Sequence, residues 1–140
     1  MKKLNLLLTM LFVSALVVAQ SNGPEIKFEN TTYDYGVIEQ NSSGVSEFVF
    51  TNVGNEPLVL SNVSASCGCT VPEWPKHPIM PGQSASIKVK YDTRRVGTIS
   101  KAVTVFSNAA TDRVMLRLKG SITATPESKL PEKPQNLMKQ

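Results

Sequence analysis

The 140-residue sequence is short of the side chains on which most catalytic sites depend. It has one histidine, His77, and its eight glycines are scattered singly at turns, so it has no glycine-rich loop that could hold a phosphate. Its close carboxylate pairs, Glu25 with Glu29 and Glu127 with Glu132, fall at the edges of the patterned region. We therefore expect a protein that is not an enzyme, with no catalytic residues, no cofactor and no resident metal.

Clustered positive charge is also scarce, apart from Arg94 and Arg95 in an expected turn. The chain has 15 basic and 11 acidic residues, but Lys2 and Lys3 belong to a leader-like segment, and 13 basic residues remain without it. A nearly balanced chain without a basic stripe is a poor candidate for binding nucleic acid. We expect no nucleic-acid partner.

The first residues, MKKLNLLLTMLFVSALVVAQ, have the pattern of a secretory signal peptide. Two lysines precede the apolar run of residues 4–18, and Val17 and Ala19 suit cleavage before Gln20. The run is shorter than the ~20 residues that span a bilayer, and no cysteine follows it for lipid attachment. We expect a signal peptide over residues 1–19, no stable membrane span after its cleavage, and a secreted or periplasmic location.

The remainder of the chain divides into one domain and a tail. Residues 20–124 are enough for a single hydrophobic core but not for two. From Thr125 onward, TPESKLPEKPQNLMKQ contains three prolines and has no apolar period. We expect residues 125–140 to form a disordered C-terminal tail.

The domain has apolar residues with a period of two, which indicates strands with one face on a core. Turn residues interrupt the pattern every 8–12 residues, and no segment has a sustained helical stripe. About seven short strands predict an all-β, immunoglobulin-like β-sandwich. The expected strands are 26–28, 32–35, 45–51, 58–64, 85–91, 99–106 and 113–122. The expected core comprises Phe48, Phe50, Leu58, Leu60, Ile87, Val89, Val103, Val105, Leu116 and Leu118.

Both cysteines lie in the segment SASCGCTVPEW, where only Gly68 separates Cys67 from Cys69. We expect them at the end of the strand that begins near Leu58, with Pro72 ending the ladder. Three interpretations stay open. The thiols form a labile disulfide or redox pair, they are small buried side chains, or they bind Cu(I) or Zn²⁺ together with His77 and Met80.

Trp74 is the only tryptophan, and it lies with His77 in a loop that prolines stiffen. One interpretation makes this loop an exposed contact for a partner. The other makes it a lid over an open end of the sandwich core, which suits a large aromatic side chain.

The segment CGCTVPEWP, residues 67–75, followed by the Pro81–Gly82 turn, resembles the bacterial exported family called domain of unknown function 1573. The resemblance extends from Phe28 to Ile122. The family is similar to immunoglobulin-like modules of the ASH/MSP/hydin kind, which implies a seven-stranded sandwich in a secreted, periplasmic or surface protein. It implies no activity, and it marks the cysteine segment as a signature without a role.

Together these observations predict an exported, non-enzymatic, immunoglobulin-like module that binds or assembles with an unknown envelope or extracellular protein. The alternative is a thiol-redox or copper-handling protein that uses Cys67, Gly68 and Cys69. Exposed, reactive thiols would favour the alternative, and inert ones the module.

Overall fold

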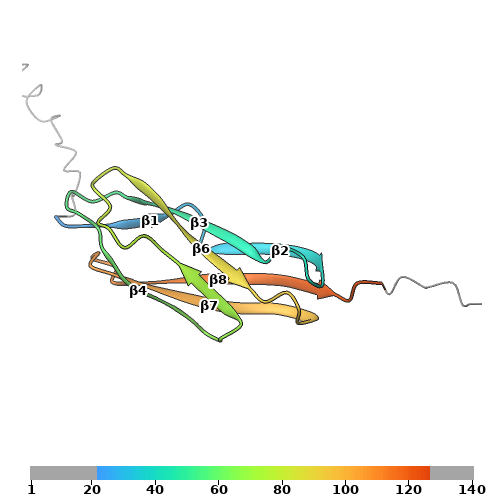
Figure 1. The fold of residues 1–140 in the computed structure, drawn as a ribbon. Helices are drawn as coiled ribbons and strands as arrows, with labels where there is room; N and C mark the ends of the chain where they lie inside the picture. The colour runs from blue at the N-terminus through green and yellow to red at the C-terminus, as the bar shows by residue number, and fades with distance from the viewer. Residues whose placement is uncertain (1–21, 127–140) are drawn as a thin grey trace, which may run out of the picture.

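The computed structural model describes residues 22–126, and within them the chain is all-β. Its strands form two four-stranded sheets that pack face to face as a sandwich (Figure 1). The first sheet has the order β1-β3-β6-β5, and the second has the order β2-β8-β7-β4. The strands are β1 (Ile26–Phe28), β2 (Thr32–Glu39), β3 (Val45–Asn52), β4 (Leu60–Ala65), β5 (Thr70–Glu73), β6 (Ser84–Tyr91), β7 (Gly97–Ser107) and β8 (Arg113–Thr123).

The hydrophobic core lies between the sheets and comes from the alternating strands. In β3, for example, Phe48 and Phe50 point inward while Glu47 is exposed on the outer face. All ten residues that the sequence predicted for the core are buried. The sandwich therefore folds as the period-two pattern requires, and the prediction of an all-β, immunoglobulin-like fold is confirmed.

The number of strands differs from the prediction because β5 follows the cysteines, where Pro72 was expected to end the ladder. β5 is an edge strand that pairs only with β6, with Pro72 opposite Val89. Asp92 N–H donates to the Cys69 carbonyl (2.8 Å), so Cys69 and Asp92 form a hydrogen-bonded pair. In an antiparallel ladder, every second residue of a strand bonds to the neighbouring strand. Val71 and Glu73 therefore bond to β6, and the backbone of Pro72 faces the free edge. Proline is tolerated at such a position because no N–H is needed there.

Several other strand limits also differ from the prediction, and two of the differences have a clear structural reason. β2 continues past Gly36 to Glu39, because a register shift between Asp34 and Val37 lets its pairing with β8 resume after the bend. β4 begins at Leu60 instead of Leu58, which forms an isolated bridge with Ile79.

The predicted signal peptide (residues 1–19) lies outside the described residues, and so does most of the predicted tail. Both stay predictions. Within residues 22–126, the structure contains no helix long and apolar enough to cross a membrane.

Candidate functional site

Cys67 and Cys69 lie in the turn between β4 and β5, and they form a disulfide with their Cα atoms 5.3 Å apart. β4 is an edge strand of the second sheet and β5 an edge strand of the first. The bridge therefore sits where the chain crosses from one sheet to the other. The sequence placed the cysteines at the end of the β4 strand, whereas they lie just beyond it.

Backbone hydrogen bonds hold this turn on both sides of the bridge. Ser66 N–H donates to the Ala102 carbonyl (2.9 Å) on β7, and Asp92 N–H donates to the Cys69 carbonyl (2.8 Å). Thr70 N–H closes the turn on the Cys67 carbonyl (3.3 Å). The cysteine backbone is thus anchored to both sheets by bonds that do not involve sulfur.

The side chain of Thr70 is buried directly beneath the bridge. Its Oγ1 lies 3.6 Å from Cys67 Sγ and 3.8 Å from Cys69 Sγ. Both sulfurs belong to a disulfide and carry no proton, so the hydroxyl is the only possible donor in either contact. One hydroxyl is thus within reach of both sulfur atoms.

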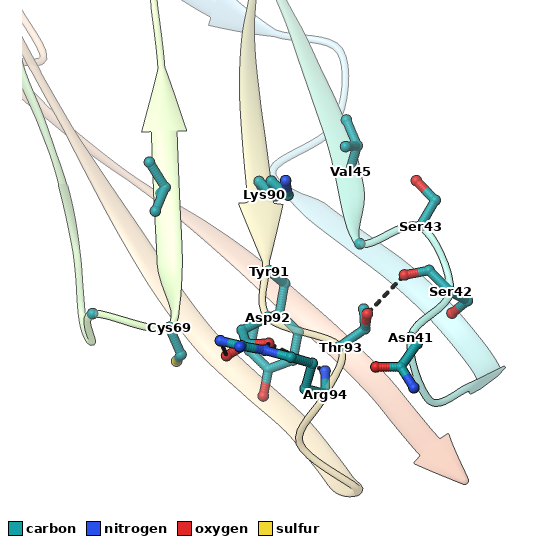
Figure 2. A pocket seen from close by; sticks show the side chains of 13 residues that line it. Asn41, Ser42, Ser43, Val45, Cys69, Lys90, Tyr91, Asp92, Thr93 and Arg94 are labelled. Carbon is teal, nitrogen blue, oxygen red and sulfur yellow. Dashed lines mark hydrogen bonds and ion pairs between the residues drawn. The ribbon is translucent and has the colours of Figure 1, made fainter. Parts of the chain in front are cut away.

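Cys69 also lines an open groove of about 690 Å³ at this end of the sandwich (Figure 2). Three segments form the groove: the β2–β3 loop, the cysteine turn with the start of β5, and the end of β6 with the loop after it. The lining includes exposed Val45 and Val71, which lie on either side of Lys90 in the first sheet.

The loops around the groove are fixed by hydrogen bonds to each other. Thr93 Oγ1 donates to the Ser42 carbonyl (2.7 Å), one of the dashed contacts in Figure 2. On the other side of the same loop, the Gly44 carbonyl accepts from the Tyr35 hydroxyl and from Tyr91 N–H, both at 2.9 Å. The groove is therefore a preformed concave surface.

Asp92 and Arg94 form an ion pair on the groove wall, beside Cys69 (Figure 2). Arg94 Nε donates to Asp92 Oδ1 (2.8 Å) and Arg94 Nη2 to Asp92 Oδ2 (2.9 Å). These bonds from the Arg94 side chain, helped by its backbone N–H, lower the pKa of Asp92 to about 2. The carboxylate is therefore ionised across the neutral pH range.

The other predicted site residues lie away from the bridge. His77 and Met80 lie in the loop after β5, on either side of Ile79. Ile79 pairs with Leu58, just before the start of β4, whereas the cysteines follow the end of β4. The structure thus does not bring His77 and Met80 together with the sulfurs. Within residues 22–126, no group of three or more His, Cys, Asp or Glu side chains is placed to hold a metal ion.

Trp74 is half-buried and packs against the hydrophobic core, and its role as a lid stays a prediction. Lys76 Nζ lies 3.0 Å from the centroid of its ring. His77 is exposed. A contact between this loop and a partner stays a prediction.

Sequence reasoning did not identify Asp92, Arg94 or the loop of residues 41–44 as part of the site. Strand pairing brings them to the cysteines, because residue 44 lies beside Tyr91 and Cys69 beside Asp92. The only local signal was the polar segment that follows the β6 strand.

Residues 26–122 match the family model described as "Protein of unknown function (DUF1573)". The chain belongs to the DUF1573 family. The resemblance seen in the sequence is thereby confirmed. No curated protein matches this DUF1573 chain in sequence.

Solved structures similar to this DUF1573 domain share its fold at low identity. A protein of unknown function from Porphyromonas gingivalis W83 has a TM-score of 0.64 and 16% identity, over 77% of this chain and 51% of that one. The ASH/PapD-like domain 7 of human CEP192 has a TM-score of 0.61 and 11% identity, over 81% of this chain and 96% of that one.

The secreted serine protease VesC from Vibrio cholerae has a TM-score of 0.53 and 17% identity, over 70% of this chain and 23% of that one. The DUF1573 chain thus spans about a quarter of VesC and about half of the P. gingivalis protein. At such identities the likeness concerns the fold alone.

Proposed function

We propose that this chain is an exported, non-enzymatic, immunoglobulin-like module of the bacterial cell envelope that binds or assembles with another envelope or extracellular protein. The observation that carries the proposal is the preformed groove at the cysteine end. Its loops are held by mutual hydrogen bonds, so a partner meets a surface that needs little ordering.

The composition of the groove favours recognition over catalysis. Val45 and Val71 offer exposed apolar area on either side of Lys90, which supplies a positive charge. The one carboxylate of the lining is Asp92, and its pKa of about 2 makes it a weak base at neutral pH. The leader pattern at the start of the sequence supports export.

Site-specific photo-crosslinking in the producing bacterium tests the proposal. A photoreactive residue is placed at Val45 in the groove, and as a control at Met115 on β8, which is exposed to the same degree (49% and 51%). We expect a discrete adduct with an exported protein from position 45 and none from position 115.

N-terminal sequencing of the same material tests export. The polypeptide recovered from the periplasm or the medium should begin at Gln20. An intact Met1 on cytoplasmic protein contradicts the export proposal, and equal crosslinking from both positions contradicts recognition by the groove.

A further inference from the structure

The bridge contributes little to the stability of the fold, which leaves its presence at the groove unexplained. A disulfide that encloses a single intervening residue removes little conformational entropy from the unfolded chain. The turn is in any case anchored by the backbone bonds of Ser66 and Asp92. A chemical use of the sulfurs accounts for their position better than a structural one.

Cys67 and Cys69 are each half-buried residues, and neither is enclosed in the core. Gly68, between them, is exposed, and a Cβ added to it would meet nothing within 4 Å. Approach over the bridge is therefore open. On the groove side, Cys69 is the cysteine that contributes to the lining.

The two sulfurs differ in their surroundings. Cys69 packs against the hydrophobic core as well as lining the groove, whereas Cys67 does not belong to the residues packed on the core. A thiolate is better solvated at Cys67. Thr70 Oγ1 lies 3.6 Å from Cys67 Sγ and can donate a hydrogen bond to that thiolate when it forms.

We propose that the Cys67–Cys69 bridge is a thiol–disulfide exchange site for a cysteine-bearing segment of another exported polypeptide that enters the groove. This activity goes beyond the binding role proposed above. The incoming cysteine loses its proton to solvent, and its thiolate attacks Cys69 Sγ. A new sulfur–sulfur bond forms between the partner and Cys69, the Cys67–Cys69 bond breaks, and Cys67 leaves as a thiolate that Thr70 stabilises.

The mixed disulfide between Cys69 and the partner can be resolved in two ways, and electrons are conserved in both. Cys67 attacks Cys69 Sγ again and releases the partner unchanged. Alternatively, a second thiolate of the partner attacks the partner's own bridged sulfur and expels Cys69 as a thiolate. In that case the partner is oxidised by two electrons, and Cys67 and Cys69 take up protons as a reduced pair. The backbone bonds of Ser66 and Asp92 hold the turn in place, so exchange with the disulfide of another polypeptide, which is itself reduced to two thiols, restores the bridge.

Single-cysteine variants test which of the two cysteines reacts with a peptide that occupies the groove. Cys67→Ser leaves Cys69, and Cys69→Ser leaves Cys67 as the matched control. Each purified variant is treated with a short unstructured peptide that carries its one cysteine as a mixed disulfide with thionitrobenzoate. Release of thionitrobenzoate gives the rate, and intact mass confirms the adduct.

We expect Cys69 to capture the peptide at least about tenfold faster than Cys67, because a peptide held in the groove lies beside Cys69. Glutathione activated in the same way is the second probe. Equal rates at the two cysteines overturn the assignment of Cys69. Reaction with glutathione but not with the peptide overturns the assignment of a polypeptide partner.

The role of Thr70 is tested by the rate at which dithiothreitol opens the bridge in the folded protein. Thr70→Val keeps the shape and removes the hydroxyl, and it should slow opening by about tenfold, the effect of one hydrogen bond to a charged group. Thr70→Ser restores the hydroxyl and should restore the rate to within about twofold.

Circular dichroism of each variant confirms that the sandwich is intact. A bridge that resists reduction until the domain unfolds overturns the exchange site. That result leaves the crosslinking test of groove binding unaffected, so the two proposals fail separately.

Discussion

The two ends of the sandwich are closed by different chemistry. At one end, β3 finishes at Asn52, whose fully buried side chain holds three loops together. At the other end, where β3 begins, the cysteine turn and its neighbours surround the open groove. One end is closed by a buried amide, and the other is crossed by a covalent bond.

The hydrogen bonds of Asn52 show how much this amide supports. Its Nδ2 donates to the carbonyls of Glu56 (2.7 Å) and Ile79 (2.9 Å). Its Oδ1 accepts from Gly54 N–H (3.0 Å) and, more weakly, from Glu25 N–H (3.4 Å). Four backbone groups from three segments thus depend on one side chain. At the covalent end, the buried hydroxyls of Thr70 and Thr93 each contact fewer groups than the Asn52 amide does. We therefore expect the hydrogen bonds of Asn52 to contribute more to stability than the disulfide.

Asn52→Leu should have the largest effect on the free energy of unfolding. It leaves the partners of the amide unsatisfied in the interior, and we expect a loss of about 3 kcal/mol or more by urea denaturation. The matched control is Asn62→Leu, since Asn62 is exposed on β4 and should change stability by less than about 0.5 kcal/mol. Similar losses in the two variants would contradict the role given to Asn52.

Replacing both cysteines by serine should have an intermediate effect. The short ring removes little unfolded-state entropy, and we expect a loss of about 1–2 kcal/mol in the same urea titration. The domain should keep its strand signal in far-ultraviolet dichroism. If the double variant lost as much stability as Asn52→Leu, the covalent end would be the main support and the comparison would be reversed.

The smallest effect on stability is expected from the ion pair of Asp92 and Arg94 beside the bridge. The pKa of Asp92 is held at about 2, below its ordinary value of 3.8, mainly by the Arg94 side chain. A lowered carboxyl pKa stabilises the folded state above the unfolded pKa, and this contribution fades as the pH falls toward 2.

An NMR titration of the Asp92 carboxyl should therefore have its midpoint near 2. Arg94→Gln should raise the pKa toward 3.8, whereas Arg95→Gln, which removes a lesser cause, should change it little. A native midpoint near 4 would show that the ion pair does not persist in solution.

The fold could be read from the sequence wherever a strand alternates over several residues. β3 carries two buried apolar side chains on one face, β6 and β8 carry three each, and every core residue predicted on these strands is buried. β5 could not be read in this way. It is four residues long, its valine points outward, and its proline is tolerated only because it lies on a free edge.

The site was only partly predictable for a related reason. Cys67 and Cys69 stand out as a local motif, but Asp92 and Arg94 join them through the pairing of β5 with β6. No spacing within the sequence encodes that neighbourhood. The separation of His77 and Met80 from the sulfurs likewise follows from the path of the loop to Ile79, which composition does not reveal.

The ends of the described chain leave the sandwich at opposite ends (Figure 1). Gly23 N–H is bonded to the Asn55 side chain beside the buried amide, and the Thr125 hydroxyl is bonded to the Gln40 carbonyl near the groove. Tension applied between these ends runs along the strands. β8 is paired with β7 on one side and β2 on the other, so such a pull shears many hydrogen bonds at once instead of opening them singly. Resistance to such a pull therefore depends on the second sheet at the C-terminal end and on the three residue pairs of β1 with β3 at the N-terminal end.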